Sequence, residues 1–224
     1  MSYDGVKMLL NMITPDNVAK LLDQLSLLCK DINYRDEDGF TLLMSAIKKR
    51  HIKGVFTLLK VGAEVDLKDF RGSTALMEAA EYGGENAMTI IRVLIYKGAN
   101  VNALSVNDWT ALMVAARYGY SHGDEKIRVL IEAGADVNKQ NINGDNALLL
   151  AIQHGGKNTF EMVCLLIESG ADANKQNEDG WTALMIAARY GGEHAVGMVR
   201  LLVARGATLP SGHWMLGANV QDEI

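Results

Sequence analysis

The chain has 224 residues and a formal net charge of −5, which is enough sequence for one large domain or two small ones. Its 49% apolar and 22% charged content is ordinary for a soluble folded protein, and the negative charge argues against nucleic-acid binding. Two cysteines cannot form a disulfide framework, and the sequence shows neither a secretory signal nor a membrane-spanning apolar run. We therefore expect a cytoplasmic protein without membrane insertion.

The first predicted element is an N-terminal cap. Thr14 is suited to cap a helix with Pro15 at its first helical position, and the apolar segment GVKMLLNMI precedes it. Residues 1–35 are therefore interpreted as capping helices or a degenerate repeat. A regular pattern begins after them.

From residue 36 onward the sequence repeats itself. A polar position recurs before each apolar segment, and a Gly-Ala pair recurs every 36 residues. Such a period is typical of a stacked array in which no single unit buries enough surface to fold alone. The polar series is Thr41, Thr74, Thr110, Asn146 and Thr182, and the pairs begin at Gly62, Gly98, Gly134, Gly170 and Gly206. The predicted repeats are 36–68, 69–104, 105–140, 141–176 and 177–208.

The second repeat shows how each one is expected to fold. Thr74 caps a first helix of good helix formers, and Gly83 is expected to end this helix in the left-handed conformation. A second helix over about 87–97 stops at Gly98, and the polar segment after it suits a β-turn or hairpin. Ala79 and Ala80 have no bulk, so neighbouring repeats can approach closely. The prediction is an all-α solenoid of stacked helix–turn–helix units joined by β-hairpin-like loops.

The C-terminal tail, residues 209–224, breaks the pattern. The fifth repeat still carries apolar residues such as Val199 and Leu201, although the terminal repeat of an array needs a polar outer face. We expect the tail to fold over that end, and the alternatives are a longer chain or an end-to-end dimer formed there. The apolar tail residues are Leu209, Trp214, Met215 and Leu216.

These repeats resemble those of the ankyrin-repeat family. GFTLLMSA, GSTALMEAA, DWTALMVAA, GDNALLLAI and GWTALMIAA match its T-P-L-H-x-A pattern, and GAEVD, GANVN, GADVN and GADAN match its trailing G-A-D-V-N. The resemblance covers about residues 18–208. The sequence departs from the pattern where Ala or Leu replaces the proline and Met or Leu replaces the histidine. Three extra residues also separate the helices of the second to fifth repeats, and we expect them to lengthen the loop or the second helix.

No pattern indicates catalysis, a cofactor or a metal. The histidines lack metal-ligand spacing, and His122 and His194 occupy a position that Asn holds in other repeats, so both are interpreted as structural. Cys164 has no recognisable base partner that would make it a nucleophile. The paired glycines lack the following Lys-Ser/Thr of a phosphate-binding loop and are interpreted as helix caps.

Three asparagines at the hairpins resemble residues that are hydroxylated in some ankyrin-repeat proteins. They are Asn102, Asn138 and Asn174. We interpret them as groups that satisfy hairpin hydrogen bonds. The basic stretch 48–53 is likewise interpreted as a solvated surface, and the alternative is a site for an acidic partner or a lipid headgroup.

The resemblance implies a concave binding face made of hairpin tips and first helices. Residues that vary between repeats on this face are free to serve a partner, and exposed Trp, Tyr and Arg contribute most to protein–protein affinity. Trp109 and Trp181 are the strongest candidates, whereas the recurring Tyr position is also compatible with packing. The candidate protein-binding residues are Phe70, Arg71, Glu81, Tyr82, Val106, Trp109, Arg117, Tyr118, Ile142, Asp145, Gln153, His154, Glu178, Trp181, Arg189 and Tyr190.

We therefore expect a monomeric, non-enzymatic module that binds another protein as an adaptor, scaffold or inhibitor. The alternative is the recognition segment of a larger bacterial or viral effector or enzyme that acts on host proteins. Such an effector would work in the host-cell cytosol.

Overall fold

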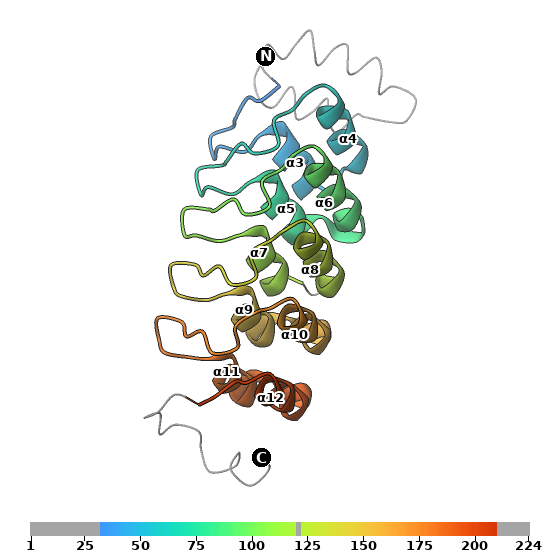
Figure 1. Cartoon of the computed structure of the whole chain (residues 1–224). Coiled ribbons are helices and arrows are strands. Elements are labelled where there is room, and N and C mark those ends of the chain that lie inside the picture. The colour runs from blue at the N-terminus through green and yellow to red at the C-terminus, as the bar shows by residue number, and fades with distance from the viewer. Residues whose placement is uncertain (1–31, 120–121, 210–224) are drawn as a thin grey trace. The chain divides into compact units, whose positions relative to one another are not determined.

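The computed structural model describes residues 32–119 and 122–209 (Figure 1). These residues form ten α-helices and three short 3₁₀ turns, with no strand among them, and the chain divides into two compact units. We call residues 1–106 the N-terminal unit and residues 107–224 the C-terminal unit. The predicted cap up to residue 31 and the tail residues Trp214, Met215 and Leu216 lie outside the described residues.

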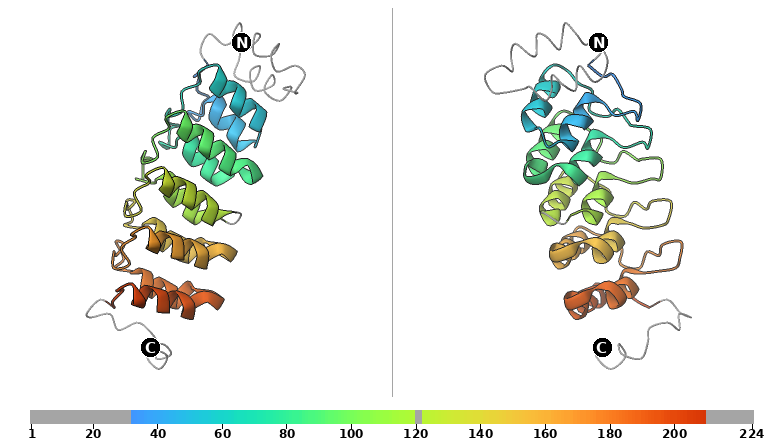
Figure 2. Two further views of the ribbon diagram at one scale, coloured as in Figure 1. Left: turned by 45° about the vertical axis from the view of Figure 1, so that its right-hand side comes forward. Right: turned by 180° about the vertical axis from the view of Figure 1, so that it is seen from behind.

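Helices of the N-terminal unit pack in pairs. The first helix of each pair packs on the second, and the two first helices, α3 and α5, pack on each other (Figures 1 and 2). A hairpin-like loop precedes each pair, with isolated antiparallel bridges at Arg35–Thr41 and Lys68–Thr74. The helices are α3 (Leu42–Lys48), α4 (Ile52–Lys60), α5 (Ala75–Tyr82) and α6 (Ala87–Tyr96).

The C-terminal unit repeats this arrangement with three pairs. Its first helices, α7, α9 and α11, pack one on the next, and its second helices, α8, α10 and α12, form a parallel layer beside them (Figure 2). The helices are α7 (Ala111–Arg117), α8 (Gly123–Glu132), α9 (Ala147–His154), α10 (Thr159–Glu168), α11 (Ala183–Tyr190) and α12 (Ala195–Ala204).

Each first helix begins at a buried side-chain cap, as the sequence predicts. In α5 the Thr74 hydroxyl accepts a hydrogen bond from the backbone N–H of Met77, and in α9 the Asn146 side-chain oxygen accepts one from Leu149. This cap satisfies one of the free N–H groups that every helix start exposes. Thr41, Thr110 and Thr182 make the equivalent bonds in α3, α7 and α11.

The paired glycines at the end of α5 divide their roles differently from the prediction. Gly83 is the C-cap, but its backbone is right-handed, with φ −56°, and Gly84 is the left-handed residue, with φ +58°. Gly83 is required by space instead: a Cβ there would lie 2.6 Å from the carbonyl oxygen of Ala79 and 2.6 Å from Cα of Ala87. The prediction that Gly83 is left-handed was therefore wrong. Glycine is required at this position because α6 approaches too closely for a side chain, and not because of the φ angle.

In the second, fourth and fifth repeats, the extra residues between paired helices form the three 3₁₀ turns. They are Gly84–Asn86, Gly156–Asn158 and Gly192–His194, so the insertions lengthen the turn and leave the second helices at ten residues each. At the far end of α6, Gly98 takes φ +87° and the N–H of Ala99 donates to the Leu94 carbonyl, which ends that helix as predicted.

The core of each unit lies between its two helix layers and between its neighbouring helix pairs. Leu76, Leu112 and Leu148 occupy one repeat position and are at most 1% exposed. Ala79 and Ala80 are completely buried, which is the close packing expected of their small side chains. At the end of the fifth repeat, Leu202 is buried but Leu209 is 48% exposed.

Candidate functional site

In the first, second, fourth and fifth repeats, the hairpin tip is folded around one short polar side chain. In the second repeat, Asp69 Oδ1 accepts hydrogen bonds from the backbone N–H groups of Arg71 and Ser73, at 2.9 and 2.7 Å. In the fifth, Asn177 Oδ1 accepts the equivalent pair from Asp179 and Trp181. Such turns fix the loop backbone, so the tip side chains project from a defined frame. Asp36 and Asn141 do the same in the first and fourth repeats.

Neighbouring tips within each unit are joined by main-chain hydrogen bonds. In the N-terminal unit, the N–H of Phe70 donates to the carbonyl of Asp38 and that of Val106 to Arg71. In the C-terminal unit, Ile142 donates to Asn107 and Glu178 to Asn143. The donor residues expose their side chains: Phe70 and Val106 are 68% exposed, and Ile142 is 55% exposed. Within each unit, these candidate residues form an exposed row on a backbone ladder.

The third and fifth repeats carry matching aromatic and basic clusters in the C-terminal unit. The Arg117 guanidinium lies over the rings of Trp109 and Tyr118, 5.5 Å from each centroid. Cation–π contacts of this kind hold a flexible side chain in place and leave its N–H groups for a ligand. Arg189 repeats the arrangement over Trp181 and Tyr190, at 5.6 and 5.5 Å, and the two rings lie 6.4 Å apart.

Between these clusters, the fourth repeat presents uncharged and acidic groups. Asp145 replaces the tryptophan and accepts a hydrogen bond from the Asn177 side-chain amide. Gln153 is exposed where Arg stands in the neighbouring repeats. Burial lowers the pKa of His154, and the charge of Arg117 acts in the same direction while Asp145 opposes it, so this imidazole is neutral at pH 7.

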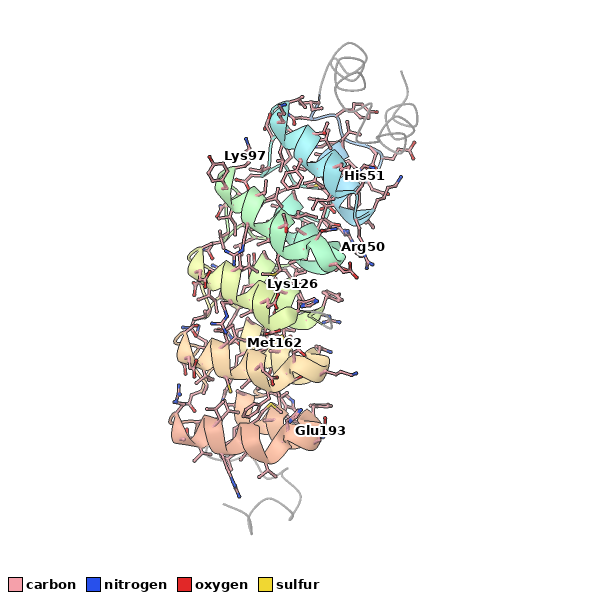
Figure 3. All side chains as sticks on the ribbon, turned by 90° about the vertical axis from the view of Figure 1, so that its right-hand side faces the viewer. Arg50, His51, Lys97, Lys126, Met162 and Glu193 are labelled. Carbon is pink, nitrogen blue, oxygen red and sulfur yellow. The ribbon has the colours of Figure 1, made fainter. Side chains whose placement is uncertain are left out.

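A groove of about 430 Å³ adjoins this row at the ends of α9 and α11. His154 and Tyr190 line it together with the glycine turns and with Glu193, which Figure 3 shows at the turn edge of the last helix pair. The candidate residues Gln153, His154 and Tyr190 therefore share one concave feature.

The N-terminal unit holds a related cluster of different composition. The Lys48 ammonium lies over the rings of Phe40 and Tyr82, at 4.7 and 5.3 Å, and the Arg71 guanidinium also lies over the Phe40 ring, at 5.6 Å. A hydrogen bond with Glu81, together with burial, raises the pKa of Tyr82 to about 12. Phe40 was missed by the sequence analysis, which considered Lys48 only as part of the basic stretch 48–53. Their positions, one before the cap and seven after it, match those of Trp109 and Arg117.

Glu78 is a second residue that the sequence analysis overlooked. It is 2% exposed, one of its carboxylate oxygens has no hydrogen-bond partner among the described residues, and the other lies 3.8 Å from Arg71 Nη2. Burial, reinforced by the negative charge of Glu81, raises the pKa of Glu78 to about 7. The available signal was its position, which is held by Val114, Leu150 and Ile186 in later repeats.

The basic stretch 48–53 is partly engaged in structure. Arg50 Nε donates to the Tyr82 carbonyl at 3.1 Å, and His51 Nδ1 caps α4 by accepting from the Gly54 N–H at 2.9 Å. Figure 3 shows both residues at the turn edge of the N-terminal unit, with Lys97 at the opposite edge. Together with Lys48 over its two rings, they have local partners, and binding of an acidic or lipid ligand there stays a prediction.

Other residues considered for chemistry have structural surroundings. His194 precedes α12 and its ring lies 6.1 Å from that of Phe160. Burial raises the pKa of the half-buried Cys164 thiol, and Glu168 and Glu161 act in the same direction. In residues 32–119 and 122–209, no group of three or more His, Cys, Asp or Glu side chains is placed to hold a metal.

Two of the hairpin asparagines link successive repeats. Asn138 donates from Nδ2 to the Gly170 carbonyl and accepts at Oδ1 from the Asp172 N–H. Asn174 makes the same two bonds to Gly206 and Thr208. Both polar atoms of each side chain are thus used in hairpin hydrogen bonds, as the interpretation of these residues requires.

Comparison with known proteins shows which family has repeats of this kind. The family model described as ankyrin repeats (3 copies) matches residues 4–103, 58–141 and 121–212. The chain belongs to the ankyrin-repeat family. It is similar to the crystal structure of an ankyrin repeat domain from Acinetobacter baumannii AYE, with 31% identity and a TM-score of 0.75, over 92% of this chain and 99% of that one.

Membership of this family sets the general class of activity. Ankyrin repeats are generally modules for protein–protein interaction, and ankyrin-repeat domains are typically non-enzymatic. Within the described part of this chain, no helix is both long and apolar enough to cross a membrane. All sixteen candidate residues are at least partly exposed, on hairpin tips or on the first helices and their C-terminal ends.

Proposed function

We propose that the chain binds a partner protein through the hairpin tips and first helices, and that it acts as an adaptor, scaffold or inhibitor. The observation that carries this proposal is the repeated cluster of Trp109, Arg117 and Tyr118 in the third repeat and of Trp181, Arg189 and Tyr190 in the fifth. Aromatic and arginine side chains held in defined positions are the residues that most often dominate protein interfaces.

The way in which the hairpins are held together supports the same proposal. The ladder joins the hairpin tips of both repeats, and the Asn177 turn fixes that of the fifth, so the rings of Trp109 and Trp181 are not needed to form the hairpins. Their positions hold Ser73 and Asp145 in other repeats, which build equivalent hairpins. Large aromatic rings where small polar residues suffice are best explained by a ligand.

Partner capture with a matched surface control tests this proposal. The double variant Trp109→Ala, Trp181→Ala is expected to lose a specifically captured partner while its far-ultraviolet circular dichroism is unchanged. Tyr96→Ala removes an aromatic ring that is 85% exposed on the second helix α6 and should leave capture intact. Equal capture by the wild type and the tryptophan variant would reject this face as the binding surface.

The alternative role as the recognition segment of a larger effector uses the same face. It differs in what the partner-binding unit is attached to, and in location, which would be the host-cell cytosol. For the adaptor role we propose a cytoplasmic location, supported by the absence of a disulfide framework among only two cysteines.

A further inference from the structure

The first helices of the C-terminal unit carry positive charge without any acidic residue. Their sequences are ALMVAAR in α7, ALLLAIQH in α9 and ALMIAARY in α11, so Arg117 and Arg189 are their charged groups beside the neutral His154. Among residues 107–119 and 122–209, neither arginine has a carboxylate within ion-pair distance. Each is held over two rings instead.

An arginine held in this way is prepared for a carboxylate. The stacked guanidinium keeps its rigid fork of N–H donors, which matches a carboxylate with two parallel hydrogen bonds. Because the rings already restrict the side chain, less rotamer freedom is lost on binding. The acidic side chain that would satisfy these arginines has to come from outside the described part of the C-terminal unit.

The fourth repeat places the opposite charge between the two arginines. Asp145 stands at the position of Trp109 and Trp181, and no cation among the described residues pairs with it. Its hydrogen-bond partner is the neutral amide of Asn177. The three successive repeats therefore present a positive, a negative and a positive group.

The spacing of the three repeats that carry these groups selects the conformation of a ligand. Helix α7 packs on α9 and α9 on α11, and packed helices lie about 8–10 Å apart. A polyproline II segment rises about 3.1 Å per residue and has three residues per turn, so every third side chain points the same way at intervals of about 9 Å. A β-strand alternates its faces and would turn the middle residue away.

We propose that the C-terminal unit binds an extended, polyproline II segment of a partner protein that carries two carboxylates six residues apart and a basic residue midway between them. The inference rests on the proposed function and specifies its ligand. The carboxylates pair with Arg117 and Arg189, and the basic residue pairs with Asp145.

Labelled synthetic peptides test this proposal by fluorescence anisotropy. The probe is a proline-rich peptide with Glu at its first and seventh positions and Lys at its fourth. The comparison peptides have inverted charges, or the two Glu only three residues apart. The probe is expected to bind at least about tenfold more tightly than either, with an affinity that falls as salt is raised.

Matched arginine variants locate the contact. Arg117→Gln with Arg189→Gln is expected to weaken binding of the probe by roughly 10- to 100-fold, because two charge-assisted contacts are lost. The control is Arg128→Gln with Arg200→Gln, which makes the same change of charge, also two repeats apart, at exposed positions of α8 and α12. The control pair should bind the probe like the wild type.

Several outcomes would overturn the inference. They are absence of probe binding, equal binding of the inverted peptide, equal weakening by the control pair, or preferential arginine-dependent binding of a single-stranded oligonucleotide, since stacked aromatic and arginine groups also suit nucleobases. If the probe fails while the tryptophan variants still abolish partner capture, the ligand chemistry is wrong and the proposed function stands. Failure of both experiments rejects both.

Discussion

The two units place different chemistry at the same repeat positions. In the N-terminal unit, α5 carries Glu78 and Glu81, and its hairpin has Ser73 before the cap. In the C-terminal unit, α7 and α11 carry arginines in their last turns that lie over the tryptophans before their caps. Caps, core leucines and hairpin hydrogen bonds are shared by both units. The residues that build the fold are therefore the same in the two units, and the charge of the exposed face is what differs.

Each unit also has a charged residue at a core position that is apolar in other repeats. Glu78 is buried at a position that is apolar in every repeat of the C-terminal unit, and Lys126 is 3% exposed at the position of Ile90, Met162 and Met198. Shared core positions should respond alike to mutation in the two units, whereas these exceptions should not.

The largest expected effect comes from removing a shared core leucine. Leu76→Ala and Leu112→Ala, one in each unit, should each lower the free energy of unfolding by about 2–5 kcal/mol, because both side chains are 1% exposed and leave a cavity. Urea denaturation followed by circular dichroism measures this loss. A cost below about 1 kcal/mol in either unit, typical of surface positions, would contradict the shared construction.

The next effect is a pH dependence caused by Glu78. With a folded-state pKa of about 7 against an ordinary 4.5, the carboxyl favours folding fully below pH 4.5, and this contribution is lost as the pH rises through 7. The loss amounts to at most roughly 3 kcal/mol.

Variants at Glu78 isolate this contribution from the other carboxyl groups. Glu78→Leu should be more stable than the wild type at pH 8, and the difference should shrink as the pH falls to 5. The exposed Glu85→Gln serves as the control and should follow the wild type at every pH. Thermal melts across this pH range measure the difference in melting temperature between wild type and Glu78→Leu. A difference that is independent of pH would exclude the titration of Glu78.

A smaller effect separates the two roles of the glycine pair in the last repeat. A Cβ on Gly191 would lie 2.7 Å from Cα of Ala195, so Gly191→Ala should cost about 1–3 kcal/mol by overpacking. Gly192 has open space around it but φ +55°, so Gly192→Ala should cost only about 1 kcal/mol through backbone strain. Chemical denaturation measures both losses of stability. A larger loss for Gly192→Ala than for Gly191→Ala would contradict the overpacking argument for the first glycine.

The smallest effect is a stabilisation in the hairpin of the third repeat. Asp108 takes φ +58° at a position where Gly39, Gly72, Gly144 and Gly180 stand in the other repeats. Asp108→Gly should raise the free energy of unfolding by roughly 0.5 kcal/mol, because relief of the left-handed strain exceeds the entropic cost of glycine. Asp179→Gly, where φ is not positive, should slightly lower the melting temperature. A loss of stability in both variants would contradict the strain argument.

Repetition explains how much could be predicted. Aligned repeats reveal caps, core leucines and helix-ending glycines, because one physical problem is solved several times with the same residues. Alignment of the repeats does not reveal which side chains of a hairpin contact which side chains of the following helix across the join between the two. The contact of Trp109 with Arg117 spans that join, and so does the approach of Glu78 in α5 to Arg71 in the hairpin. Gly83 was misassigned for the same reason, since its constraint is the approach of α6.

The ladder of main-chain hydrogen bonds between hairpin tips has an evolutionary consequence. Since Ile142 and Glu178 donate through their backbone N–H groups, almost any amino acid at these places leaves the ladder intact. New specificities can therefore arise by single substitutions that carry little folding penalty. A lineage with this scaffold can change what it recognises faster than it changes how it is built.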